Sequence, residues 1–405
     1  MLPSDWQRST IGACSKLLSG NTPSKENLDF WSGDFPWVTV KDMKTPWLHK
    51  TGLTLTEAGK AAASVAPANS ILVVTRGMAL LKDLPVSVAM RDVAFNQDIK
   101  AIVPGDSLDA RFFAYQLQSK KHVVLGMVDT AGHGTGKLDT DLLKSVDVEL
   151  PPLPEQRRIA SILGTWDQAI ATTERLLANS QRKVDALLQK LVINPAARGD
   201  WPLAPIGEIS ERVQRRASEG EKLPVLMISS GSGFVRQDEK YSRFMAGKSV
   251  ENYIALDRGE FAYNKGNSKL YEFGCVFPLQ SHERGLVPHV YVCFKLSASQ
   301  HAGFYEHLFR ADYLHDQLGA LVNTGVRNNG LLNIRPGDFL TCEVPVPPLE
   351  EQQRIAEVLS TATTWVEQQA HDLDLLKQEK AALMAQLLTG KRRVQLPDAE
   401  TGAHA

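Results

Sequence analysis

The chain has 405 residues, of which 43% are hydrophobic and 22% charged, and its formal net charge is −1. These are ordinary values for globular proteins and exclude extensive disorder, while the length predicts two or more domains. Because no run of about eighteen apolar residues occurs and the N-terminus lacks a basic segment followed by an apolar one, we expect neither a membrane span nor a signal peptide.

The cysteines lie far apart in the sequence and form no CxxC pair. This spacing argues against a zinc site and against a disulfide framework. We therefore expect a cytoplasmic protein without a bound metal or other cofactor.

Residues 1–150 contain short runs of β-branched and aromatic residues, FPWVTV, ILVVT and KAIVP, which predict strands. Loops separate these runs, and a helical stretch, DARFFAYQLQ, follows at residues 109–118. This mixture predicts a small α+β domain.

Residues 151–199 predict a long helix that begins with PPLPEQRRIA at 151–160. Proline suits a helix start, and Glu155 places negative charge near the positive end of the helix dipole. The apolar pattern predicts a helix from about residue 155 to residue 192 that ends at Asn194-Pro195. At 1.5 Å per residue such a helix rises roughly 57 Å.

Residues 200–345 predict a second α+β domain, with strand-like runs PVLMIS, EFAYN and HVYVCF and a helical stretch at 303–318. Residues 346–393 predict a second long helix that ends near Gly390, with basic residues in its last turn. A polar tail, residues 394–405, follows.

The two long helices repeat one another at a fixed offset of 196 residues. PPLPEQRRIA at 151–160 recurs as PPLEEQQRIA at 347–356, and the match continues without a gap for about forty residues. The domains correspond more faintly, because SILVVTRG at 70–77 parallels GEFAYNKG at 259–266. The pattern indicates an internal duplication in which the domains have diverged more than the helices.

Each long helix has a 3.5-residue apolar repeat over four or more heptads, which is typical of a coiled coil. Polar residues interrupt both repeats midway, at Thr173, Ser180, Gln369 and Lys380. We therefore predict an antiparallel pair of helices with one domain at each end and an internal pseudo-twofold axis. The alternative is two unrelated core helices in two separate domains.

The order of domain, PPLxEQxRIA helix, domain and PPLxEQxRIA helix resembles the specificity subunit of type I restriction–modification systems. GNTPSKENLDFWSGDFPWVTVKDM at 20–43 and AFNQDIKAIVP at 94–104 also resemble recurring segments of that family. The resemblance covers nearly the whole chain. The doubled helix motif is its most specific part, and the motifs of the second domain are its weakest.

The resemblance implies two target recognition domains, each of which reads one half of a split, asymmetric DNA site, with the helices as a spacer. It implies methyltransferase subunits, two of which bind around the helices, and restriction subunits that act as motor and nuclease. It also implies that this chain itself is not an enzyme but the non-catalytic, phage-defence specificity subunit of a DNA adenine methyltransferase and restriction complex.

The charge distribution bears on this expectation. Counted by segment, the net charge is 0 for residues 1–150, +3 for 151–199, −1 for 200–345 and −3 for 346–405. Because DNA binding requires positive charge, we expect the methyltransferase subunits to supply much of the positive surface. The helix length limits the gap between the half-sites to about 17 base pairs.

Contacts to bases and phosphates require Arg, Lys, Asn and Gln side chains on loops. In the first domain the candidate DNA-binding residues are Lys41, Lys44, Arg76, Lys82, Asn96 and Gln97. In the second domain they are Arg236, Lys240, Arg243, Asn264, Lys265, Asn267, Lys269 and His282. The alternative for each is an ordinary solvated surface residue.

The repeated helix starts hold a second group of candidates. Residues that could contact the methyltransferase subunits are Glu155, Gln156, Arg158, Glu351, Gln352 and Arg354. Alternatively, these side chains cap the helix starts and pack against the adjacent domain.

Motifs for catalysis are missing from the sequence. AGHGTGK at 131–137 lacks the first glycine of a phosphate-binding loop, because that position is Ala131, and Leu138 replaces the Ser or Thr that would bind a metal. GxGxxG, HExxH and the Asn/Asp-Pro-Pro-aromatic motif do not occur, which disfavours a methyltransferase fused to a recognition domain. An adaptor that joins proteins through its helices without binding DNA, and the specificity subunit of another modification or phage-defence system, remain alternatives.

Overall fold

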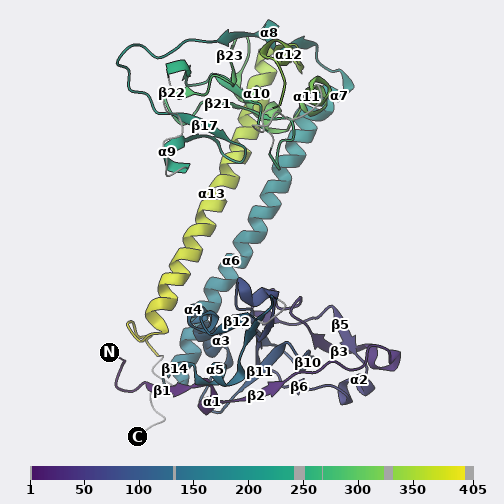
Figure 1. Ribbon diagram of the computed structural model, residues 1–405, viewed down its shortest axis with the longest axis vertical. Coiled ribbons are helices and arrows are strands. Elements are labelled where there is room, and N and C mark those ends of the chain that lie inside the picture. Colours follow the sequence, from purple (N-terminus) through teal and green to yellow (C-terminus); the bar gives the residue numbers. More distant parts are fainter. Residues whose placement is uncertain (1, 131–133, 241–250, 267, 323–331, 397–405) are drawn as a thin grey trace. The chain divides into compact units, whose positions relative to one another are not determined.

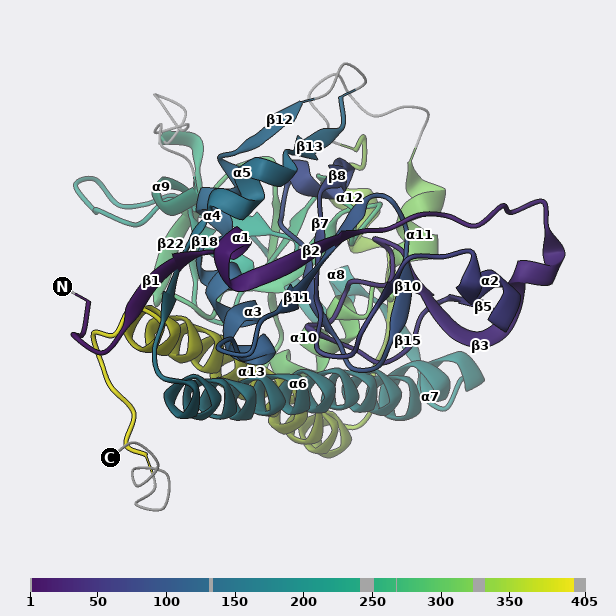
Figure 2. The same cartoon turned by 90° about the horizontal axis from the view of Figure 1, so that it is seen from below.

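The computed structural model describes residues 2–130, 134–266, 268–322 and 332–396, except for 241–250 (Figures 1 and 2). The chain forms two compact units. Unit 1 consists of residues 1–173 and 372–405, and unit 2 of residues 174–371. Each unit contains one of the predicted domains, here head 1 (residues 1–150) and head 2 (residues 200–345), together with a segment of each long helix. No helix in the described part of the chain is long and apolar enough to cross a membrane.

Head 1 is built around a five-stranded sheet whose central strand, β7, buries all of its residues. Side chains on both faces of β7 are apolar, which is why this strand lies inside the sheet. The sheet is antiparallel except where β4 runs parallel to β9. Its order is β2 (Ser15–Ser19), β11 (Ile99–Pro104), β7 (Ile71–Val74), β9 (Val86–Ala89) and β4 (Trp47–Leu48).

Three smaller sheets complete the strands of head 1. The first is β5 (Leu53–Leu55), β3 (Trp31–Val38), β10 (Val93–Phe95) and β6 (Val65–Ala66). The second, called here the ribbon, is β12 (Val128–Thr130), β13 (Gly136–Leu138) and β8 (Arg76–Gly77). The third joins β1 (Gln7–Thr10) to β14 (Asp147–Leu150).

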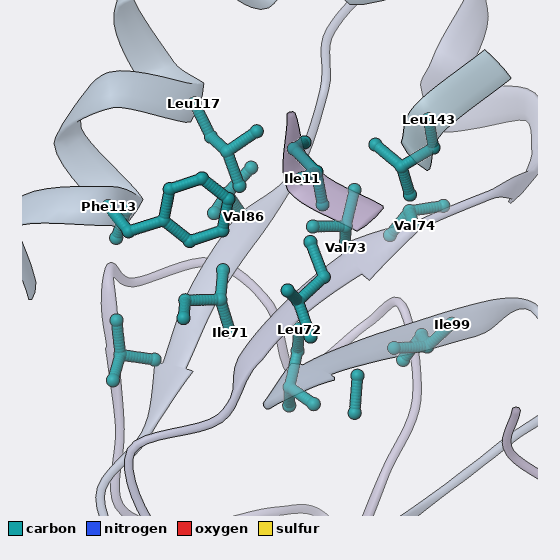
Figure 3. Close-up of a cluster of buried hydrophobic side chains, with 14 of the residues drawn as sticks. Ile11, Ile71, Leu72, Val73, Val74, Val86, Ile99, Phe113, Leu117 and Leu143 are labelled. Carbon is teal, nitrogen blue, oxygen red and sulfur yellow. The ribbon is translucent and has the colours of Figure 1, made fainter. Parts of the chain in front are cut away.

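Helix α3 (Ala110–Ser119) covers one face of the five-stranded sheet. The Asp109 side chain begins this helix by accepting hydrogen bonds from two backbone N–H groups of the first turn. Figure 3 shows Phe113 and Leu117 of α3 directed at Ile71 and Val86 of the sheet. The shorter helices of head 1 are α1 (Ile11–Cys14), η1 (Leu28–Phe30), α2 (Glu57–Ala61), η2 (Met78–Leu81), α4 (Lys121–Leu125) and α5 (Thr140–Ser145).

Head 2 repeats this framework with a four-stranded antiparallel sheet. Its order is β16 (Ser210–Val213), β23 (Val292–Leu296), β20 (Phe261–Asn264) and β21 (Cys275–Pro278). The paired strands are β15 (Leu203–Pro205) with β24 (Glu343–Pro345), β17 (Leu226–Ser229) with β18 (Gly233–Arg236), and β19 (Ile254–Asp257) with β22 (Arg284–Val287). The helices are α8 (Ile206–Ile209), α9 (Gln237–Lys240), α10 (Ala302–Arg310), α11 (His315–Leu321) and α12 (Pro336–Leu340).

The strand orders confirm the predicted duplication. The order β2-β11-β7-β9 in head 1 corresponds to β16-β23-β20-β21 in head 2. The paired sequences SILVVTRG and GEFAYNKG contain β7 and β20, which have the same place in the two orders. A local contact also repeats, because the Ser15 hydroxyl donates to the Ile11 carbonyl at 2.5 Å and the Ser210 hydroxyl to the Ile206 carbonyl at 2.6 Å.

The two long helices are α6 (Leu153–Leu188) and α13 (Leu349–Leu387). A π-helical turn, Gln189–Ile193, and α7 (Asn194–Arg198) continue α6. The predicted end at Asn194-Pro195 is therefore wrong. Proline is tolerated there because it lies in the first turn of α7, and the chain leaves the helix only at Gly199, whose φ of 75° is left-handed.

The helix segments are antiparallel within each unit, as predicted. In unit 1, Lys380 Nζ of α13 lies 2.5 Å from Asp167 Oδ1 of α6, and Leu163 shares an apolar cluster with Leu387. In unit 2, Leu187 near the end of α6 joins a cluster that contains Leu359 near the start of α13. Lys380, which interrupts the apolar repeat, is thus an ion-pair partner of the facing helix.

Candidate nucleic-acid interface

The candidate residues of head 1 lie on connections at strand ends. Arg76 is in β8, Lys82 follows η2, and Asn96 and Gln97 form the turn between β10 and β11. The Asp98 carbonyl accepts hydrogen bonds from Thr75 N at 2.8 Å and Arg76 N at 3.2 Å. The structure therefore brings Arg76 and the Asn96–Gln97 turn together, although about twenty residues separate them.

The turn residues Asn96 and Gln97 differ in accessibility. Asn96 is only 8% exposed, and its Nδ2 donates to Asp98 Oδ2 at 3.1 Å, so its side chain supports the turn. Gln97 is exposed, and its Oε1 accepts from the Thr22 hydroxyl at 2.6 Å. Lys41, Lys44, Arg76 and Lys82 are also exposed. Head 1 thus presents cations and one oriented amide at its surface.

Several candidate residues of head 2 already have partners within the head. Arg236 forms two hydrogen bonds with Asp238, at 3.0 and 2.6 Å, which neutralise much of its charge. Asn264 Oδ1 accepts from Gly266 N at 3.0 Å, and His282 Nδ1 lies 2.8 Å from the Ser281 hydroxyl.

Two of the remaining candidates of head 2 differ in burial. Lys265 is half-buried and Lys269 is exposed. Lys240 is the last residue of α9. Arg243 and Asn267 lie outside the described residues.

The glutamines of the repeated motif are buried in both units and hold the helix to its own head. Gln156, 1% exposed, accepts from Asp109 N and donates to the carbonyls of Ser107 and Pro151, all within 2.9 Å. These bonds join the helix start to the chain just before α3.

In unit 2 the equivalent glutamine makes similar contacts, with a side-chain oxygen of Gln300 in place of the Ser107 carbonyl. Gln352 is fully buried, accepts from His301 N at 2.8 Å, and donates to Gln300 Oε1 and the Pro347 carbonyl at 2.9 and 2.8 Å. Position for position, the EQ motif therefore joins each long helix to the start of α3 or α10.

The glutamates of the motif bind tryptophans at the start of each head. Trp6 Nε1 donates to Glu155, and Trp201 Nε1 donates to Glu351, each at 3.2 Å. Glu155 is 2% exposed and also forms an ion pair with Arg393, which follows α13. Glu351 is more accessible, and Arg354 lies 3.6 Å from it.

Burial separates the candidate subunit contacts into two groups. Glu155, Gln156 and Gln352 are occupied inside their own units, so their side chains offer little surface to another protein. Arg158 and Arg354 are exposed in equivalent places on α6 and α13. Nothing in the residue types alone distinguished these groups, because the difference depends on which face of the helix meets the head.

Unit 1 also contains a groove of about 1150 Å³ beside α13. Its lining combines apolar side chains, such as Leu84 and Met384, with basic ones, including the candidate Lys44. A groove lined by both apolar and charged side chains is suited to binding another protein.

The junctions of helix and head carry different polar groups in the two units. In unit 1, Tyr115 of α3 donates to Asp167, which also pairs with Lys380, and burial together with Asp167 raises the pKa of Tyr115. In unit 2, His307 of α10 lies 3.1 Å from the Ser360 hydroxyl of α13. Burial lowers the pKa of His307 to about 4, so its ring is neutral at pH 7.

Unit 2 should therefore lose stability as the pH falls from about 6.5 to about 4. In this window the unfolded chain binds a proton at His307 that the folded chain excludes, which favours unfolding. The neighbouring Glu306, whose pKa is raised by burial, acts in the opposite direction, and Arg310 and Glu367 complete the charged surroundings. The His307→Gln variant should show a smaller decrease in melting temperature between pH 7.5 and 5.0 than the wild type. Equal decreases would contradict the assignment.

The cysteines are unpaired, and Cys275, Cys293 and Cys342 are buried. Burial raises the pKa of Cys293 to about 12, so this thiol is an apolar core group and not a nucleophile. Within the described parts of the chain, no three His, Cys, Asp or Glu side chains are grouped as metal ligands would be.

Residues 3–179 match the family model described as the type I restriction modification DNA specificity domain. The chain is 30% identical over 166 residues to the EcoR124I/EcoR124II specificity subunit of Escherichia coli, a match that covers 40% of this chain and 41% of that protein. It is 21% identical over 424 residues to the MjaIX specificity subunit of Methanocaldococcus jannaschii, covering 97% of this chain and 95% of that protein.

Solved structures share the fold over nearly the whole chain. The specificity subunit from M. genitalium superposes with a TM-score of 0.58 at 17% identity, covering 95% of this chain and 96% of that one. A chain from a structure of type I restriction–modification complex assembly superposes with a TM-score of 0.53 at 15% identity, covering 97% and 100%.

Proposed function

We propose that this chain, a specificity subunit of the type I restriction–modification class, recognises a split, asymmetric DNA site, with head 1 reading one half and head 2 the other. The observation that carries the proposal is that one framework occurs twice with different surfaces. The order of four strands, the helix starts and the glutamine contacts repeat, whereas the sequences of the loops that carry Arg, Lys, Asn and Gln differ. Two different surfaces on equivalent frameworks are what an asymmetric site in two parts requires.

The chain would direct methyltransferase and restriction subunits to this site without performing catalysis itself. Exposed Arg158 and Arg354 and the groove in unit 1 are the surfaces that we assign to the methyltransferase subunits. The net charge of −1 supports this division, because it leaves much of the phosphate neutralisation to the partners.

Mapping DNA methylation in cells with and without the chain tests the proposal. The chain should be required for methylation of one motif that has two specific parts separated by an unspecific spacer. Replacing residues 1–150 with the equivalent domain of another specificity subunit should change one part of the motif and retain the other. An unchanged methylation pattern after deletion of the chain would contradict DNA recognition and would favour the adaptor.

A further inference from the structure

The ribbon of head 1 places two cations directly opposite one another. Strands β8, β13 and β12 lie next to one another (Figure 2). In the antiparallel pair of β8 and β13, Arg76 faces Lys137, and in the pair of β12 and β13, Lys137 faces Asp129. Residues directly opposite in antiparallel strands project from the same face of a sheet. The three side chains therefore form one row that carries a net positive charge.

Acidic groups lie near this row, since two backbone hydrogen bonds and, to a lesser degree, Lys137 lower the pKa of Asp139, but the described residues form no ion pair with its two cations. Arg76 and Lys137 are exposed, and neither forms an ion pair with any residue that the structure describes. Asp129 stands opposite Lys137 but is not paired with it within 4.0 Å. Like charges directly opposite one another on neighbouring strands destabilise a sheet. A binding site for an anion is a physical reason to keep such a pair.

The backbone of the ribbon is closely packed, so the two cations have a defined spacing. A Cβ atom at Gly136 would lie 2.8 Å from Leu80 Cβ, and Gly77 has a φ of 135° that favours glycine. Leu138 N donates to the Thr75 carbonyl at 2.9 Å, and the neighbouring Thr75 and Arg76 amides bind the turn that carries Gln97. The turn that carries Gln97 is therefore held next to the backbone of Arg76.

The neighbouring surface has the composition of a duplex-binding face. Met78 and Leu81 follow β8 and are 63% and 45% exposed, and Lys82 is exposed beside them. This part of head 1 therefore combines three kinds of group. Cations can bind phosphates, an amide can bind base edges, and exposed apolar side chains can contact sugars or thymine methyl groups.

We infer that Arg76 and Lys137 together bind one phosphate of the DNA backbone, and that this contact sets the position of Gln97 against the bases. The inference rests on the proposed function. The guanidinium can bind two phosphate oxygens while the ammonium acts as a point charge on the same group. Lys137 thereby becomes a DNA-binding residue that its position in the glycine-rich AGHGTGK segment did not reveal.

The test is a salt titration of DNA binding. The full-length chain in complex with its methyltransferase subunits is titrated with a mixed-sequence duplex of about 30 base pairs at several KCl concentrations. Arg76→Gln, Lys137→Gln and the double variant are compared with Lys16→Gln, an exposed lysine of β2 that faces Val103 instead of a second cation.

Each single variant should weaken binding about fivefold to tenfold, and the double variant should weaken it by less than the product of the two losses. The slope of log K against log salt should decrease by about one in the double variant. Lys16→Gln should match the wild type, and the melting temperature of the double variant should not fall, because the repulsion is removed. If the losses of affinity multiply in the double variant and the salt slope changes by about two, the two cations do not share one phosphate. If the variants bind DNA as tightly as the wild type, Arg76 and Lys137 do not form a binding site. Failure of the wild-type complex to bind any duplex would instead overturn the proposed function.

Discussion

Replacing Arg393 with Ala should destabilise unit 1 by about 2–3 kcal/mol. Arg393 binds Glu155 through Nε and Nη2, both at 2.7 Å, and binds Asp5 through Nη1 and Nη2 at 2.9 and 2.7 Å. Glu155 is 2% exposed, so removing the guanidinium leaves a buried carboxylate with Trp6 as its remaining side-chain partner. A buried charge that has lost its partner is among the most destabilising changes a single substitution produces. The loss is smaller than for a fully buried ion pair, because the Arg393 side chain is 44% exposed.

Thermal unfolding and hydrogen–deuterium exchange would measure this effect. Exchange should increase in residues 2–6, at the start of α6 and after α13, which the Arg393 contacts join. Arg392→Ala is the matched control, since Arg392 is exposed and is the adjacent residue. Arg198 offers a second comparison, because it pairs with Asp200 in unit 2 at an exposed site, and Arg198→Ala should remain close to the wild type. Equal melting temperatures for the Arg393 and Arg392 variants would refute the prediction.

Replacing Gln352 with Glu should destabilise unit 2 by about 3 kcal/mol or more at pH 7. The Nε2 group of Gln352 donates two hydrogen bonds, to Gln300 Oε1 and to the Pro347 carbonyl. A glutamate has no donor at this position, so a buried negative charge would face two oxygen atoms. The introduced carboxyl group should have a raised pKa, and the penalty should shrink as the pH falls and protonation restores one donor.

The neighbouring Gln353→Glu, at an exposed position, makes the same chemical change without burial and should be nearly neutral. Faster exchange in the Gln352→Glu variant should appear at the start of α10 and before α13, and not in head 1. The Gln156→Glu variant should reverse this pattern and affect unit 1. A Gln352→Glu variant as stable as Gln353→Glu would show that the three hydrogen bonds do not hold the junction.

These predictions concern contacts that the sequence suggested only in part. The doubled EQ motif was visible as a repeat, but its residue types fitted both a partner contact and a packing contact. Glu155, Gln156 and Gln352 are buried and pack within their own units. Their burial depends on residues far away in the sequence, such as Trp6 and His301. A linear pattern cannot show which face of a helix meets a domain.

The sequence also did not reveal the structure at the end of the AGHGTGK segment. Its glycines suggested a loop or turn, whereas its last two residues, Gly136 and Lys137, begin strand β13. Arg76, the cation opposite Lys137, lies 61 residues earlier in the sequence, in another strand. Strand pairing over such distances depends on the packing of the whole sheet, so the cation pair appears only in the tertiary structure.

The duplication, the two long helices, the α+β character of both heads and the resemblance to specificity subunits could be predicted from the sequence. All of these features depend on local periodicity or on repeated residues, which are visible in the amino-acid sequence. The fold was needed to show where α7 ends, which motif residues remain accessible, and which residues pair with Lys380 and Arg393. Those features depend on burial and on pairing between residues up to 388 positions apart, for which no local pattern exists.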